Sequence, residues 1–203
     1  MSETPVEARV RFATSDEQQD VLDACMDAFG DEAVLCWVVP RAQDREAMAR
    51  EMFSARLMAA LKARQVIVAV VADHKIAGVA LVRHEAEKHD TPVEAQSTIQ
   101  HSDELSKRFA YVARTADQAR PRNAHILIDS IAVRGRSRGR GIGTMLIEYC
   151  IELADHLAEP LFLMASTPGS VRLYKRHGFQ EQGDSIALPD DGPHLQPMWR
   201  GMP

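Results

Sequence analysis

A turn rich in glycine and arginine, Arg138–Gly143, most constrains how this chain folds. The turn follows a β-rich run, residues 126–133, and opens a stretch, Ile142–Leu157, whose apolar residues recur every three to four positions. Glycines at alternate positions allow the backbone to approach a ligand closely. The amides at the start of the following helix point outward, with the positive end of the helix dipole behind them. The sequence therefore predicts a strand, an anion-binding turn and an amphipathic helix in succession.

Three other kinds of glycine-rich or arginine-rich site differ from this turn in sequence. A dinucleotide fingerprint needs Gly-x-Gly-x-x-Gly and a nucleotide P-loop needs a terminal Gly-Lys-Ser/Thr, whereas the turn has Gly139, Gly141 and Gly143 at alternate positions. RNA-binding Arg/Gly tracts are normally repeated and disordered, and the net charge of -5 argues against nonspecific nucleic-acid binding. We therefore expect no nucleic-acid partner. The cations available for a pyrophosphate are Arg134, Arg136, Arg138 and Arg140.

The other segments alternate between strand and helix patterns, and 203 residues suit one domain spanning 1–203. A polar stretch at about 84–124 has helical spacing at Leu105, Phe109 and Val112, so we expect a helical insertion there. Predicted strands cover 10–13, 66–72, 76–82, 126–133 and 161–165. A predicted helix covers 15–29 and is opened by a capping box from Ser15 to Gln18. An apolar loop follows at 35–40, and a second predicted helix covers 41–62. A short third helix is capped by Thr167 or Ser170 and ended by Gly178.

Composition narrows the location and the metal content. The chain lacks an apolar run of about 18 residues and a basic N-terminal region followed by an apolar stretch, so we expect a cytoplasmic protein with no membrane partner. Cys25, Cys36 and Cys150 are widely spaced and form no Cys-x-x-Cys pair. They indicate reduced thiols and no metal site. Both a monomer and a homodimer are compatible with the sequence.

The phosphate-binding turn and a second motif together resemble the GNAT superfamily of N-acetyltransferases. The motifs are Val133 followed by Arg138-x-x-Gly141-x-Gly143, and the segment Leu173–Phe179 about thirty residues later. The resemblance implies an α/β (α+β) fold with a mixed, mostly antiparallel central sheet, splayed between its fourth and fifth strands, and helices on both faces. It also implies acetyl-CoA as co-substrate in the cleft, with main-chain amides near Ile131 to Val133 facing the oxyanion. The implied cofactor-binding residues are Ile131, Ala132, Val133, Arg138, Gly139, Arg140, Gly141, Ile142, Gly143, Thr144, Ser170 and Lys175.

Within that superfamily the chain is similar to puromycin N-acetyltransferase-like members. The shared features are Ala28-Phe29 at the end of the first helix, a long second helix, the insertion, and Ser166–Gly169 before the Tyr174 helix. The likeness implies a small acceptor that carries an amine, with antibiotics and toxins among the options. Thr167 is a departure, because many members have asparagine seven residues before the tyrosine.

Two side chains are the catalytic candidates, Tyr174 and Asp129. Tyr174 resembles the general acid of the family, and a phenol of pKa ~10 can protonate a thiolate of pKa ~8.5. Packing against Val171 and Phe179 is its structural alternative. Asp129 is a carboxylate on an otherwise apolar strand. It is either the base that takes the proton of the ammonium, directly or through water, or a structural group paired with a nearby arginine.

The predicted function is acetyl transfer from acetyl-CoA to a primary amine of a small molecule, by direct attack in a ternary complex. Trp37, Phe109 and Tyr111 are candidate walls of the acceptor pocket, and core packing explains each of them equally well or better. Three alternatives remain: a protein lysine or N-terminal acetyltransferase, a non-catalytic CoA-binding sensor, and an RNA-binding protein.

Overall fold

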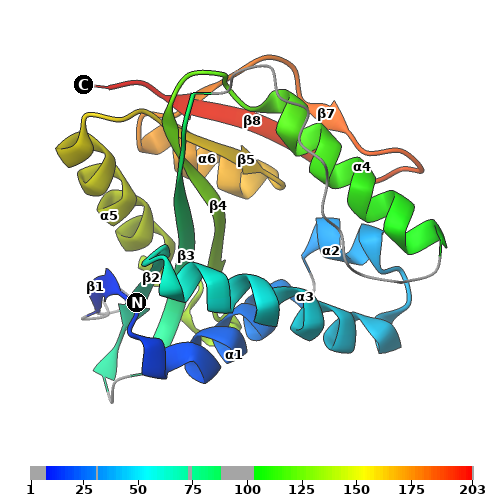
Figure 1. Ribbon diagram of the computed structural model, residues 1–203, viewed down its shortest axis with the longest axis horizontal. Coiled ribbons are helices and arrows are strands. Elements are labelled where there is room, and N and C mark those ends of the chain that lie inside the picture. The colour runs from blue at the N-terminus through cyan, green and yellow to red at the C-terminus, as the bar shows by residue number, and fades with distance from the viewer. Residues whose placement is uncertain (1–7, 31, 73–74, 88–102, 203) are drawn as a thin grey trace.

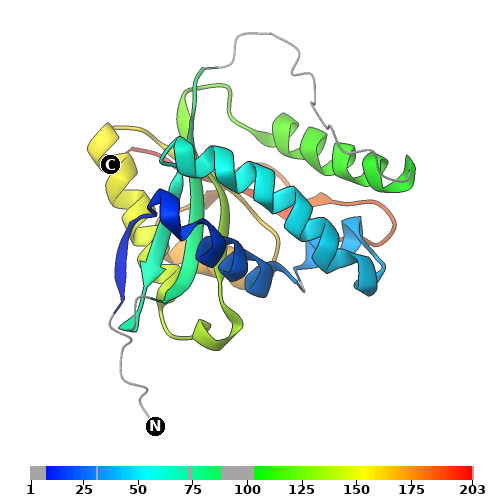
Figure 2. The ribbon, with the colours of Figure 1, turned by 60° about the horizontal axis from the view of Figure 1, so that its bottom comes forward.

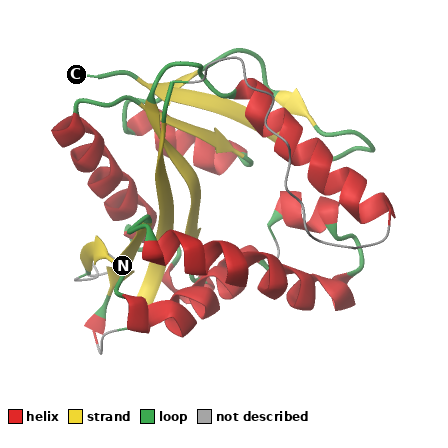
Figure 3. Ribbon diagram, in the orientation of Figure 1, coloured by secondary structure: helices red, strands yellow, loops and turns green. Residues whose placement is uncertain are grey.

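The computed structural model describes residues 8–30, 32–72, 75–87 and 103–202, which form a central sheet covered by helices on both faces (Figures 1 and 3). The strand order is β1-β2-β3-β4-β5-β8-β6, and β7 pairs with β8. One face carries α1 (Gln18–Phe29) and α3 (Ala42–Lys62), which lie in front of the sheet in Figure 2. The other carries α5 (Ile142–Leu157) and α6 (Pro168–Arg176).

Neighbouring strands run antiparallel except for β4 and β5, which are parallel. The mixed, mostly antiparallel sheet predicted from the sequence is therefore confirmed. The central strands are apolar along most of their length because helices cover both faces. The strand bounds are β1 Arg9–Phe12, β2 Val66–Val70, β3 Ile76–Glu85, β4 His125–Val133, β5 Leu161–Ala165, β6 Gln180–Glu181, β7 Ile186–Ala187 and β8 His194–Arg200.

Three apolar clusters hold the layers together. One lies between the sheet and α5 and α6, and a second lies between the sheet and α1 and α3. The third, which we name the aromatic cluster, joins α2 (Ala33–Val38), α3 and α4 (Asp103–Ala119) to Leu188 and to Leu195 of β8. In the part of the chain that the structure describes, no helix is both long and apolar enough to cross a bilayer.

Two local predictions were wrong. Residues 35–40 were expected to form a loop, but Ala33–Val38 is the helix α2, which begins where the Glu32 carboxylate accepts a hydrogen bond from the Leu35 amide at 2.9 Å. The predicted insertion starts too early, because residues 84 and 85 continue β3. The helix α4 lies within the predicted range, whereas residues 88–102 lie outside the described residues, so the insertion as a whole stays a prediction.

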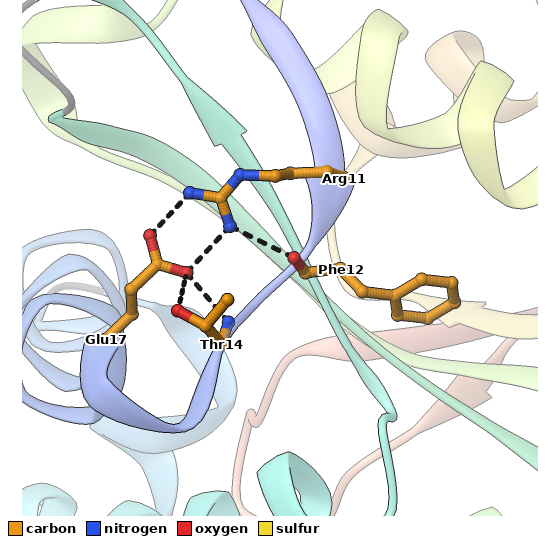
Figure 4. A network of polar contacts seen from close by, with 4 residues as sticks. All are labelled: Arg11, Phe12, Thr14 and Glu17. Carbon is orange, nitrogen blue, oxygen red and sulfur yellow. Dashed lines mark hydrogen bonds and ion pairs between the residues drawn. The ribbon is translucent and has the colours of Figure 1, made fainter.

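The capping box before α1 lies one residue earlier than predicted, at Thr14 and Glu17 (Figure 4). The Glu17 carboxylate accepts hydrogen bonds from the Thr14 amide at 2.8 Å and the Thr14 hydroxyl at 3.0 Å. It also accepts hydrogen bonds from both terminal nitrogens of Arg11 on β1, at 2.7 and 2.6 Å. The neutral side chain of Gln18 could not form such a charge-assisted pair with Arg11. The hydrogen bond to Arg11, with help from Thr14, lowers the pKa of Glu17 to about 2 against the effect of burial. This network ties the edge strand to the first helix.

We expect Glu17→Gln to lower the free energy of unfolding by about 1 kcal/mol at pH 7, measured by urea denaturation, because the charge-assisted contacts to Arg11 are lost. The pKa of Glu17 in the folded protein lies below its ordinary value of 4.5, so the unfolded chain takes up the proton first as the pH falls. The stabilisation is therefore complete above pH 4.5 and is lost towards pH 2, and the variant lacks this part of the pH dependence. Glu46→Gln is the control, since that carboxylate pairs with Arg50 while 80% exposed. Equal losses in the two variants would contradict the prediction.

Candidate active site

The arginine–glycine turn connects β4 to α5 in the order that the sequence predicts. A short 3-10 turn at Gly135–Ser137 leads to Gly139 and Gly141, whose φ angles are 72° and 84°. These angles lie in the left-handed region that glycine adopts without strain. A Cβ atom added at either glycine would meet nothing within 4 Å, so the space beside the turn is open to a ligand.

The N-terminus of α5 has no protein cap among the described residues. No side chain accepts from its first amides, and its first turn has no acidic residue. The helical bonds begin with the Met145 amide, which donates to the Gly141 carbonyl at 3.0 Å. The amides of Ile142, Gly143 and Thr144 therefore have no acceptor within the helix and are available to an anion, while their binding of a cofactor stays a prediction.

The arginines of the turn divide into two kinds. Arg134 donates to the Ile76 carbonyl at 2.8 Å, and Arg138 donates to the Ala28 carbonyl at 2.9 Å, so both fasten the turn to neighbouring elements. Arg140 is exposed, and within the described ranges its guanidinium has neither a hydrogen bond nor an ion pair. Arg140 is thus the freer cation for a phosphate, and a binding role for Arg138 stays a prediction.

The parallel pair of β4 and β5 is short. It covers three residue pairs, from Ile126–Leu161 to Ile128–Leu163, after which β5 pairs with β8 alone and β4 with β3 alone. The two strands diverge beyond this point in Figure 1. The predicted splay is therefore present, and Ile131–Val133, whose amides are expected to face the acyl group, lie in the separated part.

A β-bulge lies at the same place. Leu81 pairs with Ser130 and Val82 with Ile128, so Asp129 is an extra residue on β4 without a partner on β3. Its carboxylate forms an ion pair with Arg56 of α3. This is the structural role that the sequence left open, and a role in proton transfer stays a prediction. Sequence reasoning did not identify Arg56 as the partner of Asp129. The available signal was its position next to Leu57, which lies on the buried side of α3.

Tyr174 lies on α6 and is 9% exposed, within the cluster that α5 forms with the sheet. Its ring packs against Phe179 with centroids 5.7 Å apart. Burial raises the pKa of Tyr174 to about 12, and the adjacent Cys150 thiol adds to the shift, so the phenol stays protonated at neutral pH. A protonated phenol suits a general acid, and the packing is the alternative that the sequence also offered.

Two predicted cofactor ligands on α6 already have protein partners. The Thr167 hydroxyl accepts from the Ser170 amide at 3.1 Å, and the Ser170 hydroxyl donates to the Thr167 carbonyl at 2.8 Å. The Lys175 ammonium pairs with Glu181 at 2.8 Å. Their side chains would have to exchange these contacts to bind a cofactor, and that role stays a prediction.

The three predicted acceptor-pocket residues lie together in the aromatic cluster. The Trp37 indole donates to the Pro189 carbonyl at 2.9 Å, and its ring lies 6.3 Å from the Tyr111 ring. Phe109 packs against the same cluster, as does Met164 of β5, which lies just past the last pair with β4. The structure thus brings the three residues together, whereas contact with an acceptor stays a prediction.

His125 has a structural environment at the other end of β4. Its ring is buried, donates a hydrogen bond from Nδ1 to the Asn123 carbonyl at 2.7 Å, and packs edge-on with the rings of Phe162 and Trp199. Burial lowers the pKa of His125. The described residues contain no group of three or more His, Cys, Asp or Glu side chains placed to hold a metal ion.

Comparison with known proteins decides the family. The family described as "Acetyltransferase (GNAT) family" matches residues 22–179. The chain belongs to the GNAT acetyltransferase family. It is accordingly an acetyl-CoA-dependent N-acetyltransferase, and the uncapped α5 N-terminus with its open glycines fits the diphosphate of that co-substrate.

Solved structures with the same fold cover nearly the whole chain. Arylalkylamine N-acetyltransferase 2 from Aedes aegypti has a TM-score of 0.76 at 22% identity, over 97% of this chain and 100% of that one. A structure described as histone acetyltransferase HPA2 and related acetyltransferase from Corynebacterium glutamicum has a TM-score of 0.71 at 22% identity, over 97% of both chains. A polyamine N-acetyltransferase from Drosophila melanogaster has a TM-score of 0.66 at 14% identity, over 97% of this chain and 100% of that one. At these identities the likeness establishes the fold alone. No curated protein sequence matches the chain.

The predicted site residues lie on both faces of the sheet. The arginine–glycine turn opens α5, and Tyr174 packs in the cluster on the α5 face. Asp129 pairs with α3, and the aromatic cluster includes residues of α2 and α3. The two halves are joined by the part of β4 that has separated from β5.

We expect Arg140→Glu to weaken acetyl-CoA binding about 10-fold or more, measured by calorimetry, because a carboxylate would replace the free cation beside the α5 amides. The fold should be unaffected, since Arg140 is exposed. Arg41→Glu is the matched control, because it also places a carboxylate at a helix N-terminus but on α3, across the sheet. Similar losses of affinity in both variants would show a general charge effect instead.

We expect Tyr174→Phe to lower kcat about 100-fold at an unchanged KM for acetyl-CoA, because the thiolate loses its proton donor. Thiol release under saturating acetyl-CoA measures this. Tyr149→Phe on α5, whose ring packs edge-on against Phe12, should keep its activity. Full turnover by the Tyr174 variant would leave Tyr174 with the packing role alone.

Proposed function

We propose that the protein acetylates a primary amine of a small molecule by direct attack in a ternary complex. The observation that carries this proposal is the placement of the two halves of the site on opposite faces of the sheet. Acetyl-CoA would enter from the α5 face and the acceptor from the face of α1 and α3. Both would meet where β4 has left β5. Such an arrangement holds both reactants at once and needs no covalent enzyme intermediate.

Each chemical step has a residue to serve it. The neutral amine attacks the thioester carbonyl, and the amides of Ile131–Val133 stabilise the oxyanion in the separated part of β4. Tyr174 donates its proton to the thiolate as the carbon–sulfur bond breaks. The proton lost by the amine passes to Asp129, directly or through water, or to bulk solvent. The products are the acetamide and free CoA.

The aromatic cluster supports an acceptor with an apolar body. Rings at Phe29, Phe53, Phe109 and Tyr111 are only partly buried, and methionines beside them offer an adaptable apolar wall. One structure of similar fold is an arylalkylamine N-acetyltransferase and another acts on polyamines. The apolar wall favours the first type of amine. An antibiotic or toxin amine, and the likeness to puromycin N-acetyltransferase-like members, stay narrower predictions, as do the cytoplasmic location and the oligomeric state.

The attachment of α4 supports a small acceptor over an extended peptide. Arg108 of α4 donates to the Trp37 carbonyl at 2.6 Å, and its guanidinium lies 4.9 Å from the centre of the Trp37 ring. These contacts hold α4 against α2, beside the aromatic cluster. A protein lysine substrate would need an open groove along this side.

We expect thiol release from acetyl-CoA with aromatic primary amines such as 2-phenylethylamine, in an assay that also includes an aminonucleoside, an aminoglycoside, a polyamine and a lysine peptide. An aromatic amine should give the highest kcat/KM, because its body can pack on the aromatic cluster. Tight binding of acetyl-CoA without release for any amine would instead support the sensor alternative. Preference for the lysine peptide would support the protein acetyltransferase alternative.

A further inference from the structure

An ion pair joins α3 to β4 at the point where β4 leaves β5. The Arg56 guanidinium contacts the carboxylate of Asp129, the first residue after Ile128, which is the last residue of β4 paired with β5. The Asp129 side chain is 16% exposed and the Arg56 side chain 50% exposed. The carboxylate therefore lies at the separated part of the strand, and the arginine covers it from the acceptor face.

The pair sets the charge that an incoming amine meets. A lone carboxylate would attract every ammonium and would attract a diammonium ion most strongly. The Arg56 guanidinium compensates that charge. The pair is therefore close to neutral overall, with a fixed cation on its solvent side.

The apolar surroundings of the ion pair offer little solvation to a second positive charge. Phe53, one turn before Arg56 on α3, stacks on Phe29 with ring centroids 5.1 Å apart and packs against both neighbouring clusters. Beyond Phe53 lies the aromatic cluster. The far end of a diamine would thus meet either the Arg56 cation or an apolar wall that cannot solvate it.

We propose that Arg56 is a specificity-determining residue that restricts the acceptor to amines with a single positive charge. This inference rests on the proposed function, because it assigns the acceptor class of the same site. Pairing with Asp129 leaves enough attraction for one ammonium to approach the carboxylate before it loses its proton. The same pairing disfavours diamines and polyamines of equal length.

The test compares two amines that differ only in the terminal charge, hexylamine and 1,6-diaminohexane. We expect the ratio of kcat/KM for the diamine to that for the monoamine to rise roughly tenfold in Arg56→Met, because the repelling cation is gone and Asp129 is uncompensated. Arg56→Gln, a second uncharged variant, should show the same rise. Arg56→Lys keeps the cation and should keep the wild-type ratio.

Arg50→Met controls for the loss of one positive charge from α3, since Arg50 pairs with Asp23 and Glu46 on the exposed side of the helix. It should also keep the wild-type ratio. Calorimetry with acetyl-CoA shows that each variant retains the folded co-substrate site. An unchanged ratio in both Arg56→Met and Arg56→Gln, with hexylamine turned over, would overturn the inference alone. Wild-type enzyme that binds acetyl-CoA and acetylates 2-phenylethylamine but not hexylamine would overturn the inference alone. Wild-type enzyme that binds acetyl-CoA but acetylates none of these amines would overturn the proposed function, and the inference with it.

Discussion

The site depends on a parallel strand pair that ends after three residue pairs. β8 holds β5 along its whole length and β3 holds β4, so each strand is fixed on its outer side while the two diverge. Backbone amides and carbonyls that lose a strand partner need another one. In the proposed site these groups would face the co-substrate, and the backbone of Asp129–Val133 is held in place by the rest of the sheet instead of by local sequence.

The bulge at Asp129 changes which face of the sheet the following residues of β4 contact. Before it, Ile126 and Ile128 pack in the cluster on the α5 face; after it, Ile131 and Val133 pack there, and Ala132 packs on the α1 and α3 face. Strict alternation would have placed Ile128 and Ala132 on the same face. Asp129 follows Ile128 in ordinary alternation, so its carboxylate lies on the α3 face, and the extra residue shifts the alternation beyond it so that Ala132 faces α1 and α3 as well.

Sequence predicted the features whose causes are local. The glycines of the turn, the start of α5 and the Thr167 cap follow from backbone preferences within a few residues, and the structure has each of them. The missed features depend on distant partners. The capping box before α1 is set by Arg11 on another element, and the Arg56–Asp129 pair joins residues far apart in the chain. Hydrophobic periodicity carries no information on which charged side chains meet across layers.

Thr167 shows how one departure from the family pattern is accommodated. Many GNAT members have asparagine at this position, and asparagine and threonine are both good N-caps. Here the Thr167 hydroxyl caps α6 and engages Ser170 in a reciprocal box. The cap fixes where the helix begins, and Tyr174 follows two turns later on the side that packs against Phe179. The hydroxyl group that could have bound a ligand is thereby used to orient the proposed acid, so the departure at Thr167 is compatible with the predicted chemistry.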